Sequence, residues 1–189
     1  CFIVHNDERL MAEVIKVVGV NAYVQVFEST RGLRVGSAVE FQGHMLEVTL
    51  GPGILSRNYD GLQNDLDKME GVFLKRGEYT DPLHRDVKWT FKPLAKAGDS
   101  VTAGSWLGEV MENSIPHKIM VPFKMDGRYK VKSVVAEGDY IVDDTIAVVT
   151  DEDGTEYPLT MVQKWPVKMA VRSYKEKPRP FKLLETGVR

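Results

Sequence analysis

One pattern occurs twice in the middle of the chain. Residues 97–110 (AGDSVTAGSWLGEV) and residues 137–149 (EGDYIVDDTIAVV) each hold a Gly-Asp turn, a β-branched residue, a polar turn and an apolar strand. Each copy has one apolar face that the other copy can cover. The repeat therefore predicts two similar halves, related by an approximate two-fold axis and folded on each other as a compact β-sandwich.

Aligning the two copies predicts equivalent positions in the two halves. We expect Gly98 and Gly138 to lie in related turn conformations. We also expect Trp106 and Ile146 to be equivalent core positions, so that truncating the tryptophan would cost about 3–5 kcal/mol.

The first fifty residues read as successive short strands. Residues 22–27 (AYVQVF) alternate between apolar and polar with period two, as a half-buried strand does. Short strands at this spacing predict a small barrel over residues 1–50. Because Cys1 already lies in an apolar, strand-like run, we expect the first strand of this barrel to be cut. The other expected strands cover residues 13–18, 37–41 and 45–48.

A glycine-rich corner follows the barrel. Gly51, Pro52 and Gly53 come directly after a strand, where glycines often cradle a phosphate. Pro52, however, removes a central N–H donor, and no Gly-Lys-Ser or Gly-Lys-Thr occurs anywhere in the sequence. We interpret the run as a sharp corner of the chain rather than a phosphate loop.

Residues 60–70 hold the one segment with a helical pattern. Leu62, Leu66 and Met69 would share one face, and Asp60 is a suitable cap. We expect this stripe to pack against the barrel.

These patterns divide the chain into parts. The fold class is mainly β: a truncated N-terminal β-barrel plus an inserted β-sandwich of the barrel-sandwich, carrier-domain-like kind. A final hairpin is predicted around Asp153 and Gly154. The expected parts are the barrel at 1–50, a corner and short helix at 51–72, the β-sandwich at 73–163, and a basic linker at 164–189.

Composition excludes several classes of protein. A net charge of −2 gives no electrostatic case for nucleic acid or acidic lipid. The single cysteine excludes an internal disulfide framework. No apolar run approaches the length of a membrane span. The basic tail at 164–182 could contact RNA or phosphate, but such mild runs are more often solvated linkers.

The sequence marks out no metal site. The four histidines are scattered, without an HxxxH pair or a second cysteine. Residues 151–154 (DEDG) start like a calcium loop, but Val149 and Thr160 stand where its first and last ligands should be. The histidines are His5, His44, His84 and His117.

The repeat resembles biotinyl and lipoyl carrier domains, whose modified lysine lies on a hairpin between the halves. Lys118 and Lys124 are the two candidates, and Phe123-Lys124-Met125 half-matches the Met-Lys-Met of biotin carriers. Asp126-Gly127 forms a turn directly after Lys124, so we expect neither lysine to carry a prosthetic group. No nucleophile elbow of the Gly-x-Ser-x-Gly kind is present, and we name no catalytic, cofactor-binding or metal-ligating residue.

Several blocks resemble the catalytic A subunit of V/A-type rotary ATPases, in family order across nearly the whole chain. The insertion between the corner and the "WPV" motif is typical of this subunit and not of its non-catalytic or F-type relatives. Lys75 departs from the family, which often has proline there. The blocks are 25–36 (QVFESTRGLRVG), 50–55 (LGPGIL), 59–63 (YDGLQ), 71–77 (GVFLKRG), 117–122 (HKIMVP), 161–167 (MVQKWPV) and 183–189 (LLETGVR).

The resemblance implies a parent subunit that binds ATP with magnesium and couples hydrolysis or synthesis to proton or sodium transport. It implies that residues 51–72 start a nucleotide domain, that residues 73–163 are the bulge insertion domain and that residues 164–189 lead to the nucleotide-binding core. It also implies a ring that alternates with a non-catalytic B-type subunit, contacts with peripheral and central stalks, and a cytoplasmic place peripheral to the membrane. No nucleic-acid partner and no direct membrane insertion are implied.

We expect the chain to be a piece excised before the phosphate loop, with ring assembly and stator contact as its own role. As a fragment it would hold no cofactor and hydrolyse no ATP. The alternative from another class is a biotinyl- or lipoyl-carrier-like binding module.

Overall fold

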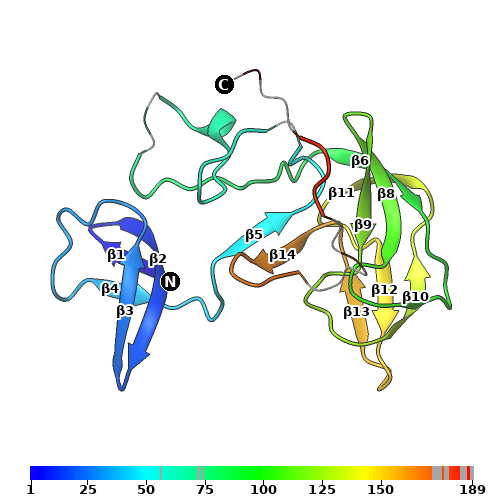
Figure 1. Ribbon diagram of the computed structural model, residues 1–189, viewed down its shortest axis with the longest axis horizontal. Coiled ribbons are helices and arrows are strands. Elements are labelled where there is room, and N and C mark those ends of the chain that lie inside the picture. Colours follow the sequence, from blue (N-terminus) through cyan, green and yellow to red (C-terminus); the bar gives the residue numbers. More distant parts are fainter. Residues whose placement is uncertain are drawn as a thin grey trace.

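The computed structural model describes residues 1–55, 57–71, 73, 75–171, 176, 179–183 and 187. Within these residues the chain is built almost entirely of antiparallel sheet, which confirms the mainly β prediction. The N-terminal sheet lies at one end of the molecule and the sandwich at the other, with two paired strands between them (Figure 1). Most of the motif at 183–189 and part of the predicted basic linker lie outside the described residues.

The N-terminal sheet has four strands in the order β3-β2-β1-β4. A two-residue turn joins the first two strands, and both of its residues, Asn6 and Asp7, have positive φ, the geometry that suits the twist of a tight hairpin. Its buried core consists of Ile3, Leu10 and Ala12 among the described residues. The strands are β1 (Phe2–His5), β2 (Glu8–Val18), β3 (Asn21–Val26) and β4 (Ala38–Glu40).

The next strand leaves this sheet. β5 (Glu47–Leu50) corresponds to the strand expected at 45–48, but it pairs with β14 (Gln163–Pro166) and not with the barrel strands. Leu50 lies opposite Gln163 in this two-stranded ladder. The chain therefore departs for the insertion and returns from it at neighbouring positions.

The insertion is a sandwich whose two halves exchange a strand. One sheet has the order β11-β6-β8-β9 and the other β13-β12-β10-β7. The second strand of each half thus pairs with the first strand of the other half, and the strand order confirms the two-fold arrangement. The strands are β6 (Lys88–Pro93), β7 (Ser100–Val101), β8 (Trp106–Glu112), β9 (Ile115–Met120), β10 (Tyr129–Val134), β11 (Gly138–Ile141), β12 (Ala147–Thr150) and β13 (Glu156–Leu159).

Equivalent strands bury equivalent pairs. Phe91 pairs with Val110 in one half, and Val131 pairs with Val149 in the other. All four side chains are buried in the single apolar core of the sandwich. The predicted hairpin around Gly154 is also present, between β12 and β13.

The predicted alignment of the two copies is wrong by one residue at β8. Ile146 is fully buried, but Trp106 is 57% exposed, and the neighbouring Leu107 is buried in its place. A register irregularity between Trp106 and Gly108 accompanies this change. In a strand, a shift of one residue moves a side chain to the opposite face.

The two Gly-Asp segments also differ locally. Gly98 has a φ of +96°, whereas Gly138 lies in β11 and is not in the positive-φ region. The expectation of related turn conformations is therefore wrong, although the strands that follow the glycines occupy equivalent places.

The helix expected over 60–70 is a single 3-10 turn, η1 (Leu66–Lys68), capped by Asp65 and not by Asp60. The carboxylate of Asp60 instead accepts from the backbone N–H groups of Leu62 and Asn64, which closes a tight turn. Leu66 is exposed, so the predicted apolar stripe does not form.

Candidate functional site

The Gly-Pro-Gly corner holds an anion, but the anion is a side chain of the same protein. Oε1 of Glu112 accepts a hydrogen bond from the backbone N–H of Gly53 at 2.8 Å and another from that of Leu55 at 3.0 Å. Gly53 has a φ of +102°, a conformation that favours glycine. Backbone N–H groups that converge in this way form an anion-binding concavity.

The other carboxylate oxygen of Glu112 bonds to the second half of its own hairpin. Oε2 lies 2.7 Å from Nδ1 of His117, which donates because an ionised carboxylate can only accept. Asn113 and Ser114, both with positive φ, form the tight turn that joins β8 to β9 and brings the two side chains together. Glu112 is only 2% exposed, so its carboxylate is buried, while its partners are partly exposed.

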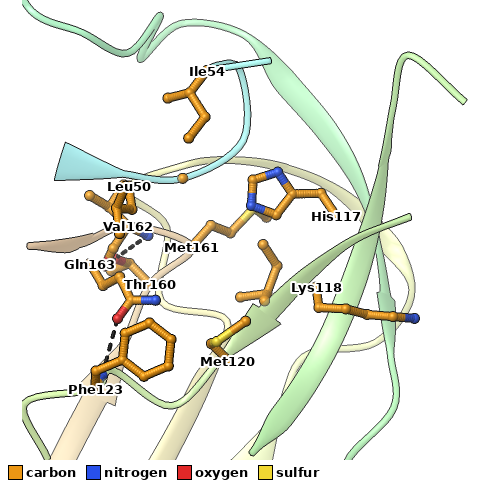
Figure 2. A pocket seen from close by; sticks show the side chains of 12 residues that line it. Leu50, Ile54, His117, Lys118, Met120, Phe123, Thr160, Met161, Val162 and Gln163 are labelled. Atoms are coloured by element: carbon orange, nitrogen blue, oxygen red, sulfur yellow. Dashed lines mark hydrogen bonds between the residues drawn. The ribbon is translucent and has the colours of Figure 1, made fainter. Parts of the chain in front are cut away.

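A hollow of about 210 Å³ lies beside this contact, between the corner, β9 and the return to β14. Figure 2 shows Ile54 and His117 at one end, and Met120 and Phe123 at the other. Gln163 closes the lower edge by accepting from the N–H of Phe123 at 3.1 Å. The lining is mainly apolar, with few convergent polar groups, and suggests packing between segments more than a catalytic centre.

A larger hollow of about 840 Å³ lies between the N-terminal sheet and the β5–β14 ladder. Apolar side chains such as Ile15 and Phe41 line much of it. Its charged groups include Glu13 and Lys168, which pair with each other at 2.8 Å. These two charges therefore satisfy each other instead of pointing at a ligand.

The two lysines that were candidates for modification lie in different settings. The ammonium of Lys118 points away from the hollow of Figure 2, pairs with the carboxylate of Glu109 and lies 4.8 Å from the ring centroid of Trp106. Lys124 is exposed in the connection between β9 and β10, which joins the two halves. The absence of a prosthetic group on either lysine stays a prediction.

Two of the four histidines are hydrogen-bonded to carboxylates within the fold. His117 contacts Glu112, and Nε2 of His84 lies 3.1 Å from the buried carboxylate of Asp65. Within the described ranges, no group of three or more acidic, histidine or cysteine side chains is placed to hold a metal ion.

The acidic hairpin tip satisfies its own carboxylate. Asp151 accepts from the N–H groups of Asp153 and Thr155 and from the hydroxyl of Tyr157. Desolvation acts to raise the pKa of Asp151, but these hydrogen bonds outweigh it and hold the pKa below its usual value. The tip is thus a self-contained turn.

A third carboxylate joins the N-terminal sheet to the segment that leads into the sandwich. Glu28 accepts from the hydroxyl of Tyr79 at 2.5 Å and from the N–H of Gly77 at 2.7 Å. The same hydroxyl accepts from the N–H of Met11 at 2.6 Å, and the Tyr79 ring packs edge-on against Phe2. Tyr79 therefore fixes the N-terminal sheet against residues 75–80.

The sequence offers His117 as one of four scattered histidines that form no metal site and as the first residue of the family block at 117–122, and nothing in the sequence marks out Glu112. The signal that could have found the pair was the corner itself, since a loop that exposes backbone N–H groups requires an acceptor. The corner alone could not identify which carboxylate is the acceptor, because Glu112 lies far from Gly53 in the sequence.

Among the residues that the structure describes, no helix is long and apolar enough to cross a membrane.

Comparison with known proteins gives matches in both main parts of the chain. Residues 2–43 match the ATP synthase alpha/beta family, beta-barrel domain, and residues 80–168 match the ATPsynthase alpha/beta subunit barrel-sandwich domain. These matches confirm the predicted combination of a barrel-type N-terminal part with a barrel-sandwich.

Curated relatives match along nearly the whole chain. The V-type ATP synthase alpha chain of Treponema denticola is 51% identical over 187 residues, which cover 97% of this chain and 32% of the relative. That of Borrelia garinii subsp. bavariensis is 45% identical over 191 residues, covering 100% and 33%. That of Protochlamydia amoebophila is 46% identical over 190 residues, covering 98% and 32%. The chain spans about a third of the length of these relatives.

Proposed function

The chain belongs to the ATP synthase alpha/beta family, and we propose that it forms the barrel and barrel-sandwich part of the catalytic subunit of a V-type rotary ATPase. The observation that carries the proposal is the alignment with V-type ATP synthase alpha chains, at 51% identity over 187 residues. The parent subunit would bind ATP and magnesium and couple ATP turnover to proton or sodium transport.

The role of these residues would be mechanical. The N-terminal sheet would contribute to ring assembly with a non-catalytic B-type subunit, and the sandwich would contact the peripheral stalk. Exposed apolar side chains on the N-terminal sheet, including Val17 and Tyr23, support an assembly surface there. The parent complex would hold the chain on the cytoplasmic side, peripheral to the membrane, next to a central stalk and without nucleic acid.

The sandwich has features that suit a rigid contact. Its strands share one apolar core, and Arg85 links it to the entering segment by bonding to both Asp81 and Asp143 at 2.5 Å. On its surface, Lys132 of β10 pairs with Glu156 of β13, across the intervening strand β12. A stator must resist rotation, which favours a body of this kind over a flexible loop.

Calorimetry tests the division of labour between this chain and the rest of the subunit. We expect Mg-ATP to give no specific binding to the 189-residue chain, because its sequence lacks the lysine-bearing phosphate loop that holds a triphosphate. The complete parent subunit serves as the positive control. Micromolar affinity in the 189-residue chain would contradict the proposal.

Removing the sandwich from the parent subunit tests the mechanical role. Deleting residues 88–159 and bridging the ends with a short flexible linker leaves β5 and β14 in place. We expect ATP-driven ion transport or complex assembly to be impaired, while the nucleotide affinity of the isolated subunit is kept. Normal coupled transport without the sandwich would show that stator contact is not its role.

The carrier-like alternative makes an opposite prediction for Lys118 and Lys124. A carrier would show the mass of biotin or lipoate on a peptide that contains one of them. We expect unmodified peptides by mass spectrometry of the protein isolated from its own cells.

A further inference from the structure

We propose that Glu112 is an anionic latch: its carboxylate occupies the concavity of the Gly-Pro-Gly corner and fixes the orientation of the β8–β9 hairpin, and with it the sandwich, relative to residues 51–55. This inference concerns contacts within the chain. It can be tested on the 189-residue chain whether or not the proposed ATPase role holds.

The geometry of the latch is convergent. Two backbone donors from the corner, on Gly53 and Leu55, meet one oxygen at 2.8 and 3.0 Å, and a side-chain donor from His117 meets the other at 2.7 Å. Donors from two separate segments thus hold one carboxylate at both of its oxygens. Hydrogen bonds to a charged acceptor are shorter and stronger than those between neutral groups.

Because Glu112 is buried, its hydrogen bonds matter for the stability of the junction. The residue is 2% exposed, so a bare carboxylate there would be costly, and three hydrogen bonds compensate for the lost water. The converse also holds, because removing the carboxylate would leave the N–H groups of Gly53 and Leu55 without their acceptor. The corner and the hairpin are therefore each incomplete without the other.

Apolar packing at the same junction also brings the segments together, and it depends less on direction than a hydrogen bond does. Gly51 is tightly enclosed: a Cβ there would lie 3.2 Å from both Leu83 and the carbonyl oxygen of Met161. Ile54 packs against the sandwich core. Such contacts are non-directional, whereas the latch specifies which backbone groups of the corner face the hairpin.

Chemical rescue of Glu112→Ala tests the latch directly. The heavy atoms that this substitution removes are those of an acetate ion, so free acetate can return the carboxylate to the concavity. Amide hydrogen exchange at Gly53 and Leu55 reports the two donors themselves. Glu109→Ala is the matched control, because Glu109 lies on the same strand but pairs with Lys118 on the outer face.

We expect Glu112→Ala to speed exchange at Gly53 and Leu55 by about tenfold or more, with the core strands β10 and β12 changed less than about twofold. Acetate should restore protection at these two amides, and chloride at equal ionic strength should not. Glu109→Ala should leave both amides unchanged. Unchanged exchange in Glu112→Ala, or equal rescue by chloride, would overturn the latch.

Glu112→Gln separates charge from shape and serves if the alanine variant does not fold. Glutamine keeps one acceptor oxygen, but it loses the charge and places an NH₂ group near His117. We expect an intermediate loss of protection at Gly53 and Leu55, by about threefold to tenfold. Full protection in Glu112→Gln would show that the contact does not depend on an anion.

Discussion

Neighbouring residues on β8 lie on opposite faces of the strand. Leu107 is fully buried in the sandwich core, and Trp106 lies on the outer face, where its ring contacts the ammonium of Lys118. Size and hydrophobicity made the tryptophan the obvious core candidate in the sequence. The register irregularity that places Trp106 on the outer face of β8 cannot be recognised from the residue types around it.

Alanine substitutions at these two positions should differ in cost. Leu107→Ala should lower the free energy of unfolding by about 2–5 kcal/mol, because it leaves a cavity in the core. Trp106→Ala should cost about 1 kcal/mol, the scale of an exposed cation–π contact. Denaturant unfolding measures both, with Ile146→Ala as the equivalent core truncation in the other half. Equal losses at Leu107 and Trp106 would contradict the assignment of their faces.

At the scale of elements, hairpins can be predicted from local sequence, whereas pairings between strands far apart in the sequence cannot. The turn at Gly154 was predictable because glycine supplies the positive φ that the hairpin needs. The pairing of β5 with β14 was not, since nothing within residues 47–50 identifies a partner far along the chain. The helical stripe at 60–70 failed because Asp60 bonds to its own following N–H groups, an alternative that competes with a helix.

The link between the N-terminal sheet and residues 75–80 should respond to alkaline pH through Tyr79. Burial, and then the hydrogen bond to Glu28, raise the pKa of Tyr79 well above its ordinary value. The folded state thus holds this proton more tightly than the unfolded state. Its contribution to stability is present in full below about pH 10 and is lost as the pH rises through the raised folded-state value.

Tyr79→Phe should therefore destabilise the chain by about 1–3 kcal/mol at neutral pH, since Met11 loses an acceptor and Glu28 loses a donor. The difference from the wild type should shrink as the pH is raised above about 10. Urea unfolding at several pH values measures it, with Tyr23→Phe at an exposed position as the control. A difference that stays constant with pH would rule out the proposed role of the hydroxyl.

For the whole molecule, the two parts have cores of very different size. The sandwich buries side chains from both of its sheets in one cluster, while the described core of the N-terminal sheet consists of Ile3, Leu10 and Ala12. Buried apolar surface is the main source of stability. The repeat in the sequence was sufficient to predict the sandwich, whereas the small core of the sheet depends on contacts that the pattern of residues 1–50 does not reveal.

Hydrogen exchange should reflect this difference. Amides of β2 and β3 should exchange at least about tenfold faster than those of β8, β10 and β12, because local opening costs less where little apolar surface is buried. The measurement uses the intact 189-residue chain at neutral pH. Uniform protection across both parts would indicate a single cooperative unit.

The candidate site is not predicted by the sequence, in which the Gly-Pro-Gly run reads as a sharp corner and no site residue is marked. The glycines of the corner raised the question of an anion, and Pro52 argued against a phosphate. Only the fold shows that the hairpin of β8 and β9 brings Glu112 to that place. When a side chain of the same protein occupies an anion-binding corner, the sequence of that corner looks like the sequence of an ordinary turn.

The ladder of β5 and β14 has a consequence for how such a chain can change over time. Because Leu50 and Gln163 face each other, the polypeptide between them begins and ends at one place. We expect that the strands of the sandwich, β6 to β13, could be lengthened, shortened or replaced without redirecting β5 or β14, provided that Gln63 and residues 75–80, which contact the host part, are kept. The insertion therefore has the layout of an exchangeable cassette, and this ladder is the natural splice point for grafting one subunit's insertion onto another.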